Sequence, residues 1–141
     1  MKKNILILLF TTLVGAQGIN SNINSFKTNV VLRPSENNIE VIAFVEIFNR
    51  NLQFLKKDSN FESSYDLNIS IISKDGSKID EKSFSETIVV ENFSQTVSRA
   101  NPILITTSFE IPFQEFDVNF SLKDMDTKLT CLLYTSDAAD E

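Results

Sequence analysis

The sequence predicts an all-β fold, an antiparallel β-sandwich of six to seven strands. Apolar and polar residues alternate in several segments, as at Val41, Ala43, Val45 and Ile47, and a period of two places such a set on one face of a strand. Turn-forming residues separate these segments, and no segment of useful length has the period of an amphipathic helix. The 141 residues, 42 % of them hydrophobic, provide room for one domain with its own core.

The first 18 residues are typical of a secretory signal peptide. Lys2 and Lys3 form a positively charged start, residues 5–14 form a short apolar segment, and small residues follow at 14–16. The apolar segment is too short to span a bilayer, which takes about 20 residues. We therefore expect export, a mature chain that begins at Gln17, and no membrane span within it.

The strands expected after this leader alternate in polarity and end at turn-forming residues. They cover residues 26–32, 39–48, 61–73, 79–84, 87–90, 103–111 and 116–122. The strand over 39–48 has apolar side chains on both faces, which predicts a central position, and the more polar 79–84 is expected at a sheet edge. Asp75-Gly76 between two alternating segments predicts a tight hairpin. Together these features predict an immunoglobulin-like or fibronectin-like sandwich over residues 19–130.

The predicted core consists of the inward-facing side chains of these strands. The most buried are expected to be Phe44, Val45, Leu67, Ile69, Ile71, Ile105, Phe109, Val118 and Phe120. A register error of one residue would exchange the two faces of a strand, so this set also tests the assigned register.

The last eleven residues, 131–141, differ in composition from the rest of the chain. The body is rich in Asn, Lys, Ile and Phe, whereas this segment holds the only Cys, Cys131, and two of the five Ala residues. The eleven residues resemble the conceptual translation of a transposase-type sequencing adapter, read through at the end of a fragment. From this resemblance we expect a non-native tail that hangs free of the domain, and a natural protein that continues beyond about Thr130.

Composition excludes several classes of function. The net charge of −6 argues against nucleic acid or an anionic membrane as partner, because phosphate binding needs clustered Lys and Arg. The sequence has no His, the commonest general base and metal ligand, and its single Cys cannot form an internal disulfide. Phe accounts for 12 aromatic residues, Tyr for 2 and Trp for none, which favours core packing over stacking on carbohydrate.

Three groups of residues were weighed as sites, and none is assigned a catalytic, cofactor-binding or metal-binding role. The run Asp124–Thr127 begins like a calcium loop but lacks its glycine and distal glutamate, so a solvated turn is the better interpretation. Asp117 and Asp124 offer two carboxylates for glycoside hydrolysis, although such pairs are common by chance. Lys56-Lys57 offers an anion site, but a pair with apolar stems packed at a loop is the better interpretation.

Two groups of motifs carry a resemblance to a known family. They are Leu52-Gln53-Phe54-Leu55-Lys56 with Phe61, Tyr65 and the turn at Asp75-Gly76, and then Phe109-Glu110-Ile111-Pro112 with the strand from Phe116 and the run Asp124–Thr127. These match L-Q-F-x-K, an aromatic, a D-x-D-G-type turn, lPPGxY and D-x-x-S/T, and residues 26–128 thereby resemble the N-terminal region of GWxTD-domain proteins. The chain departs from the family at Asn49, where the family has proline, and at Gln114-Glu115, where it has a glycine turn. The Gly-Trp-x-Thr-Asp signature is absent from this sequence, and in the family it lies further along, in a helical C-terminal region.

The resemblance implies an exported bacterial envelope protein of unassigned activity. With no catalytic constellation in the sequence, we expect a non-catalytic β-sandwich module with an interaction or structural role, a fragment of a longer GWxTD-domain-like protein. Its partner is expected to be a protein or another envelope component, and its location periplasmic, outer-membrane-associated or extracellular. The alternative is an accessory binding domain of a secreted enzyme whose catalytic part lies outside this chain. No cofactor is expected for either.

Overall fold

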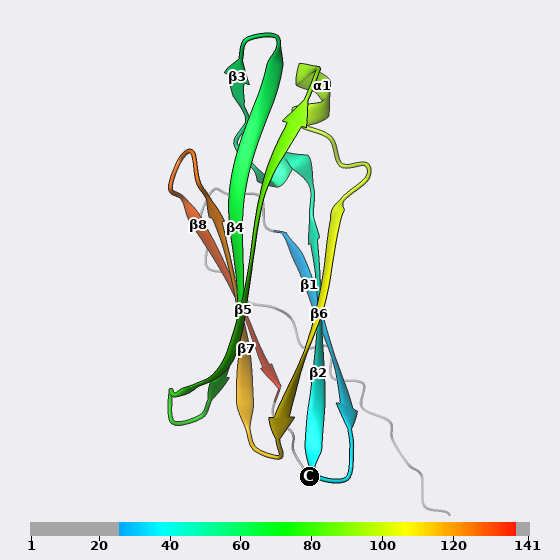
Figure 1. Cartoon of the computed structure of the whole chain (residues 1–141), viewed down its shortest axis with the longest axis vertical. Coiled ribbons are helices and arrows are strands. Elements are labelled where there is room, and N and C mark those ends of the chain that lie inside the picture. The colour runs from blue at the N-terminus through cyan, green and yellow to red at the C-terminus, as the bar shows by residue number, and fades with distance from the viewer. Residues whose placement is uncertain (1–25, 138–141) are drawn as a thin grey trace, which may run out of the picture.

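The computed structural model describes residues 26–137, which form two antiparallel sheets packed face to face (Figure 1). The strands are β1 (Lys27–Pro34), β2 (Asn38–Ile47), β3 (Leu55–Lys57), β4 (Asn60–Ser73), β5 (Lys78–Val90), β6 (Ile103–Pro112), β7 (Phe116–Asp124) and β8 (Thr130–Asp137), and the helical turns are η1 (Asn49–Asn51) and α1 (Phe93–Thr96). The predicted all-β sandwich is confirmed, but it has eight strands in the described residues and not six to seven. The expected signal peptide, residues 1–18, lies outside the described residues.

The smaller sheet consists of β1, β2 and β6, with β2 in the middle. Its register places Val31 of β1 beside Ile42 of β2, and Ile42 beside Ser108 of β6. The central position predicted for residues 39–48 is therefore confirmed. Strand β6 comes from a part of the chain about 60 residues further on, so this sheet is closed by a long-range pairing.

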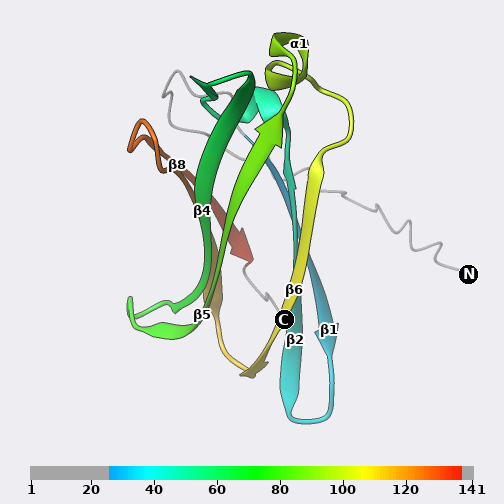
Figure 2. The same cartoon turned by 45° about the horizontal axis from the view of Figure 1, so that its top comes forward.

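The larger sheet is built around β4. Strand β5 pairs with one side of β4, while β3 and β7 pair with successive parts of its other side, and β8 pairs with the outer side of β7. The two segments predicted at 79–84 and 87–90 are one continuous strand, β5, because the polar residues between them keep their pairing with β4. Its edge position is confirmed, since the only strand it pairs with in residues 26–137 is β4. Figure 2 shows β4, β5 and β8 in one layer and β1, β2 and β6 in the other.

The predicted hairpin at Asp75-Gly76 joins β4 to β5. Gly76 has a φ of 87°, a conformation that side chains disfavour, and its N–H donates to the Ser73 carbonyl at 2.9 Å. The Asp75 carboxylate accepts bonds from the Ser77 hydroxyl at 2.6 Å and the Ser77 N–H at 2.9 Å, and these bonds hold the pKa of Asp75 below its usual value.

The core lies between the sheets and is formed by the inward faces of β2, β4, β6 and β7. Seven of the nine predicted core residues are at most 2 % exposed: Val45, Leu67, Ile69, Ile71, Phe109, Val118 and Phe120. The remaining members of the same faces, such as Val41, Ile47, Tyr65 and Phe116, are equally buried. The period-two patterns of these strands therefore correctly identified one buried face of each.

For two residues, Phe44 and Ile105, the predicted burial in the core is wrong. Phe44 is 37 % exposed, because Val41, Ala43, Val45 and Ile47 occupy the inward face of β2 and the even-numbered residues point outward. The expectation that both faces of this strand are covered is wrong for the described residues. Ile105 faces inward but is only partly buried, since β6 is an edge strand and leaves its inward side chains open on one side.

The expectation that the chain hangs free from Cys131 onward is also wrong for residues 131–137. They belong to β8, which pairs with β7 from Thr130 beside Lys123 to Asp137 beside Phe116. The Cys131 side chain is 7 % exposed, and Leu133 packs against the core. Without β8, the outer edge of β7 would leave backbone N–H and C=O groups unpaired and part of the core uncovered. An alternating segment pairs with these backbone groups and covers the core with its apolar side chains. The resemblance to an adapter translation concerns the origin of these residues and stays a prediction.

Inward-pointing charges lie along the edge strand β5. The Lys82 ammonium donates to the Ser108 carbonyl of β6 at 2.6 Å and lies 5.1 Å from the centre of the Phe109 ring. Glu86 accepts a bond from the Tyr65 hydroxyl at 3.1 Å, and burial, followed by this contact, raises the pKa of Tyr65. Charged inward residues are a common protection of sheet edges against further strands, and Lys82 covers the facing edges of β5 and β6 together.

Replacing Ser63 by alanine is expected to stabilise the domain by about 1 kcal/mol. Ser63 faces inward on β4 and is fully buried, and its hydroxyl has no hydrogen-bond partner among the described residues. Alanine removes a desolvated polar group at the loss of little volume. Urea denaturation of both proteins measures the difference, and a destabilised alanine variant would show that the hydroxyl has a favourable partner.

Candidate functional site

Asp124, at the end of β7, accepts hydrogen bonds from three backbone amides. Its Oδ1 accepts bonds from the N–H groups of Asp126 at 3.0 Å and Thr127 at 2.9 Å, and its Oδ2 accepts one from Gln53 at 2.7 Å. The side chain is 8 % exposed. It therefore shapes the turn between β7 and β8 and attaches that turn to the segment before β3.

The calcium-loop interpretation of Asp124–Thr127 is not supported by this geometry. Both carboxylate oxygens of Asp124 are engaged, and Asp126 accepts a bond from the Ser64 N–H at 3.3 Å. Within residues 26–137, no group of three or more His, Cys, Asp or Glu side chains is arranged to hold a metal ion. The turn is a structural element, although it is more buried than the solvated turn that the sequence predicts.

Replacing Asp124 by alanine is expected to lower the free energy of unfolding by about 2–3 kcal/mol, because three amides lose a charged acceptor. Asparagine keeps one acceptor oxygen and is expected to lose about half as much. Guanidinium denaturation measures both variants. Equal losses for alanine and asparagine would contradict the bonding pattern, since they would show that the carboxylate oxygens contribute nothing specific.

The structure does not bring Asp117 and Asp124 together. They lie seven residues apart on the same strand, which separates them by about 23 Å and places them on opposite faces. Asp117 accepts a bond from the Lys74 ammonium at 2.8 Å. The two carboxylates of a glycosidase lie within about 10 Å of each other across the scissile bond. Asp117 and Asp124 are too far apart to act on the same glycosidic bond.

Lys56 and Lys57 lie in β3, which forms a hairpin with β4. The Lys57 ammonium is 2.6 Å from a Glu62 carboxylate oxygen, and this bond raises the pKa of Lys57. Phe61 beside it packs edge-to-face with Phe93 of α1, with 6.0 Å between ring centres. An anionic ligand of Lys57 would have to displace Glu62, so the arrangement favours a structural interpretation of Lys57.

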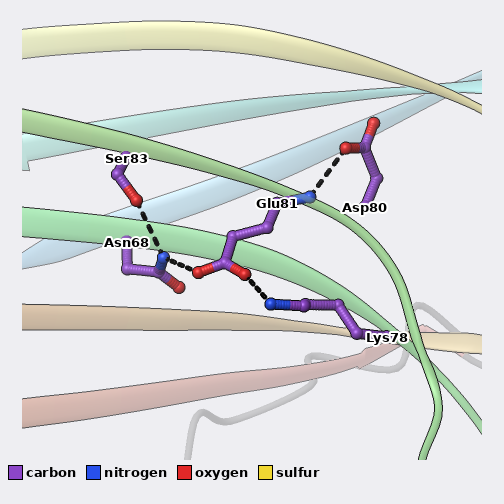
Figure 3. A network of polar contacts seen from close by, with 5 residues as sticks. All are labelled: Asn68, Lys78, Asp80, Glu81 and Ser83. Atoms are coloured by element: carbon purple, nitrogen blue, oxygen red, sulfur yellow. Dashed lines mark hydrogen bonds and ion pairs between the residues drawn. The ribbon is translucent and has the colours of Figure 1, made fainter.

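On the outer face of the larger sheet, polar side chains bond to one another across β4 and β5. The Ser64 and Thr87 hydroxyls are 2.8 Å apart, and the Ser85 hydroxyl donates to Asp66 at 2.6 Å. Further along, Figure 3 shows the Asn68 amide between Ser83, at 3.0 Å, and Glu81, whose carboxylate also binds Lys78. Lys78 and then Asn68 lower the pKa of Glu81. The middle of this face is therefore polar across β4 and β5, whereas Leu132 and Tyr134 are exposed on it at β8.

On the outer face of the smaller sheet, apolar side chains lie on all three strands. They are Val31 on β1, Ile42 and Phe44 on β2, and Leu104 on β6, and we call them the apolar stripe. Phe44 is 37 % exposed, Val31 44 % and Leu104 69 %. Leu104 lies opposite Glu46 of β2, Phe44 lies two residues along β2 from Glu46, and Val31 lies opposite Ile42, two residues further. The stripe is therefore diagonal, and it extends about 13 Å along the strands and about 10 Å across them.

Paired charges border the apolar stripe at both ends. Lys27 lies 3.6 Å from Glu46 at one end, and Arg33 lies 3.1 Å from Glu40 at the other. Beyond the second pair, the Asn38 amide donates to Glu110 at 2.9 Å. Sequence reasoning missed the stripe because it assigned Phe44 to the core. The assignment of Val41, Ala43, Val45 and Ile47 to one face contained the signal, since it places Ile42 and Phe44 on the other.

Comparison with known proteins adds no relative. The chain matches no family model, and no curated protein resembles it significantly. No helix among residues 26–137 is long and apolar enough to cross a membrane.

Proposed function

We propose that this chain is a non-catalytic interaction module of an exported bacterial envelope protein, and that it docks a protein partner against the apolar stripe. The observation that carries the proposal is the exposure of Val31, Phe44 and Leu104 together on one sheet face, along a diagonal that crosses all three strands of the smaller sheet. Contiguous exposed apolar side chains with a polar border are typical of protein interaction sites.

The chemistry of the stripe favours a protein over a glycan or a polyanion. Three of its four side chains are aliphatic, so they offer little surface for stacking on sugar rings. The neighbouring cations Lys27 and Arg33 are each paired with a glutamate, so neither offers an unpaired positive charge for phosphate beside the stripe. A protein surface with apolar side chains and a few complementary charges fits both properties.

The absence of catalysis is supported by the roles of the candidate carboxylates. Asp124 is occupied by three backbone amides, and Asp117 by Lys74. Neither carboxylate is free to act as a general acid or base without breaking a structural bond. Turnover of any glycan, peptide or ester by the purified chain would overturn this part of the proposal.

We also propose that the module belongs to a longer GWxTD-domain-like protein. Two of the motifs that carry the resemblance meet in space, since the Gln53 N–H of the L-Q-F motif donates to Asp124 of the D-x-x-T motif. This contact supports the proposal, because it gives residues of both motifs a role in holding the same turn. Sequencing the uninterrupted gene tests the proposal: we expect a Gly-Trp-x-Thr-Asp signature downstream, and a complete reading frame without one would contradict it.

Docking on the stripe is tested with two matched double variants of the full chain. Phe44→Glu with Leu104→Glu places charges on the stripe, whereas Phe113→Glu with Leu132→Glu makes the same changes at exposed positions outside it. Immobilised proteins are exposed to solubilised envelope proteins of a bacterium that carries the gene. We expect the unmodified chain and the control to retain the same protein, and the stripe variant to retain at least about ten-fold less. Equal retention by all three would overturn docking on the stripe.

A further inference from the structure

The free edge of β1, like that of β8, differs from the edges of β5 and β6. Among residues 26–137, β1 pairs only with β2, so the backbone groups on its other side have no strand partner there. The facing edges of β5 and β6 are covered by Lys82, whereas the middle of β1, residues 28–32, contains no charged residue and no proline. An edge without such protection is able to accept a further strand.

The sequence of β1 is complementary to itself in one antiparallel register. With Val31 opposite Val31 of a second copy, Val30 lies opposite Leu32, and Asn29 lies opposite Arg33. Residues opposite each other then share a face of the sheet, as antiparallel pairing requires. The three central pairs are apolar, and no like charges are directly opposed.

The neighbouring registers that keep the faces aligned are worse. Centring the pair on Val30 would oppose Lys27 to Arg33 and Asn29 to Val31. Centring it on Asn29 would oppose Val31 to Lys27, and centring it on Leu32 would oppose Val31 to Arg33. Only the register centred on Val31 pairs apolar with apolar side chains on both faces.

We infer that two copies of this chain pair through β1 in this register, so that the two smaller sheets become one continuous six-stranded sheet. Val30 and Leu32 pack partly against the core and are covered on their open side by the second copy. On the outer face, the Val31 side chains of the two copies lie opposite each other at the two-fold axis, each beside Ile42 of its own copy. This contact joins the two apolar stripes. The inference goes beyond the proposed function because it concerns an edge, and its partner is the chain itself.

Sedimentation of the full chain tests the dimer. We expect a dimer that dissociates on dilution, and loss of that dimer in Val31→Lys, because two lysines would lie directly opposite each other. Leu104→Lys is the matched control on the same face, at the strand furthest from the β1 edge, and is expected to sediment like the unmodified chain. A monomer at all concentrations up to about 200 µM, where even a weak Kd would be detected, or a dimer that survives Val31→Lys, would overturn the inference.

Cysteine cross-linking tests the register and keeps the inference separate from stripe docking. In a Cys131→Ala background, Val31→Cys is expected to form a disulfide-linked dimer, whereas Asn29→Cys is not, because its two copies would be about 13 Å apart. Efficient cross-linking through position 29 and not 31 would overturn the register. The variant with Phe44→Glu and Leu104→Glu is expected to remain dimeric although it loses partner docking. Dimerisation and docking are therefore tested by separate measurements, and failure of one proposal does not decide the other.

Discussion

Replacing Phe109 by alanine is expected to lower the free energy of unfolding by about 3–5 kcal/mol, the usual effect of deleting a large buried aromatic side chain. Phe109 is 2 % exposed and lies beside Val41 in the smaller sheet, with its ring between the two layers. Alanine would leave a cavity there and remove the ring beneath the Lys82 ammonium. Urea denaturation of the two proteins measures the difference.

Phe44→Ala is the matched control for this prediction. The two residues are of the same type and lie on adjacent strands, but Phe44 is 37 % exposed on the outer face. Its replacement is therefore expected to change the free energy of unfolding by no more than about 1 kcal/mol. If Phe44→Ala is the more damaging of the two, the register of β2 is displaced by one residue and its faces are exchanged.

Deleting residues 131–141 is expected to destabilise the domain by about 2–4 kcal/mol, since the core loses the side chains of Cys131 and Leu133 and β7 loses its outer partner. The thermal midpoint should fall by roughly 10 °C for a domain of this size. Differential scanning calorimetry of the shortened and full chains measures this change. An unchanged midpoint would show that residues 131–137 do not pack, as the sequence alone predicts.

Point variants in β8 separate packing from the mere presence of the strand. Cys131→Asp places a charge in the core, whereas Leu132→Asp places it on an exposed position, and only the first is expected to be strongly destabilising. Burial also raises the pKa of the Cys131 thiol, so the folded chain should react slowly with iodoacetamide at neutral pH. Rapid alkylation without denaturant would contradict the position of β8.

The fold class, the hairpin and one face of each long strand could be predicted from the sequence because their signals are local. Alternation at Val41, Ala43 and Val45 identifies a strand with two unlike faces, and Asp75-Gly76 supplies a turn that needs a positive φ. The motif residues Gln53 and Asp124 were also recognised from the sequence. Their contact was not, because hydrogen bonds between residues 71 positions apart leave no periodic trace.

Tertiary structure alone decided which strands meet, which apolar faces stay exposed and which edges stay open. When both faces of a strand carry apolar side chains, alternation does not show whether another layer packs on each face. The sequence therefore predicts Phe44 in the core, whereas it lies on the exposed face. Nor does it say that the edge of β7 accepts the segment from Thr130, whose composition sets it apart from the domain. Backbone pairing and apolar cover depend on the shape of the facing surface and not on the origin of the strand that fills it. For that reason the apolar stripe and the free edge of β1 emerge only once the two sheets are in place.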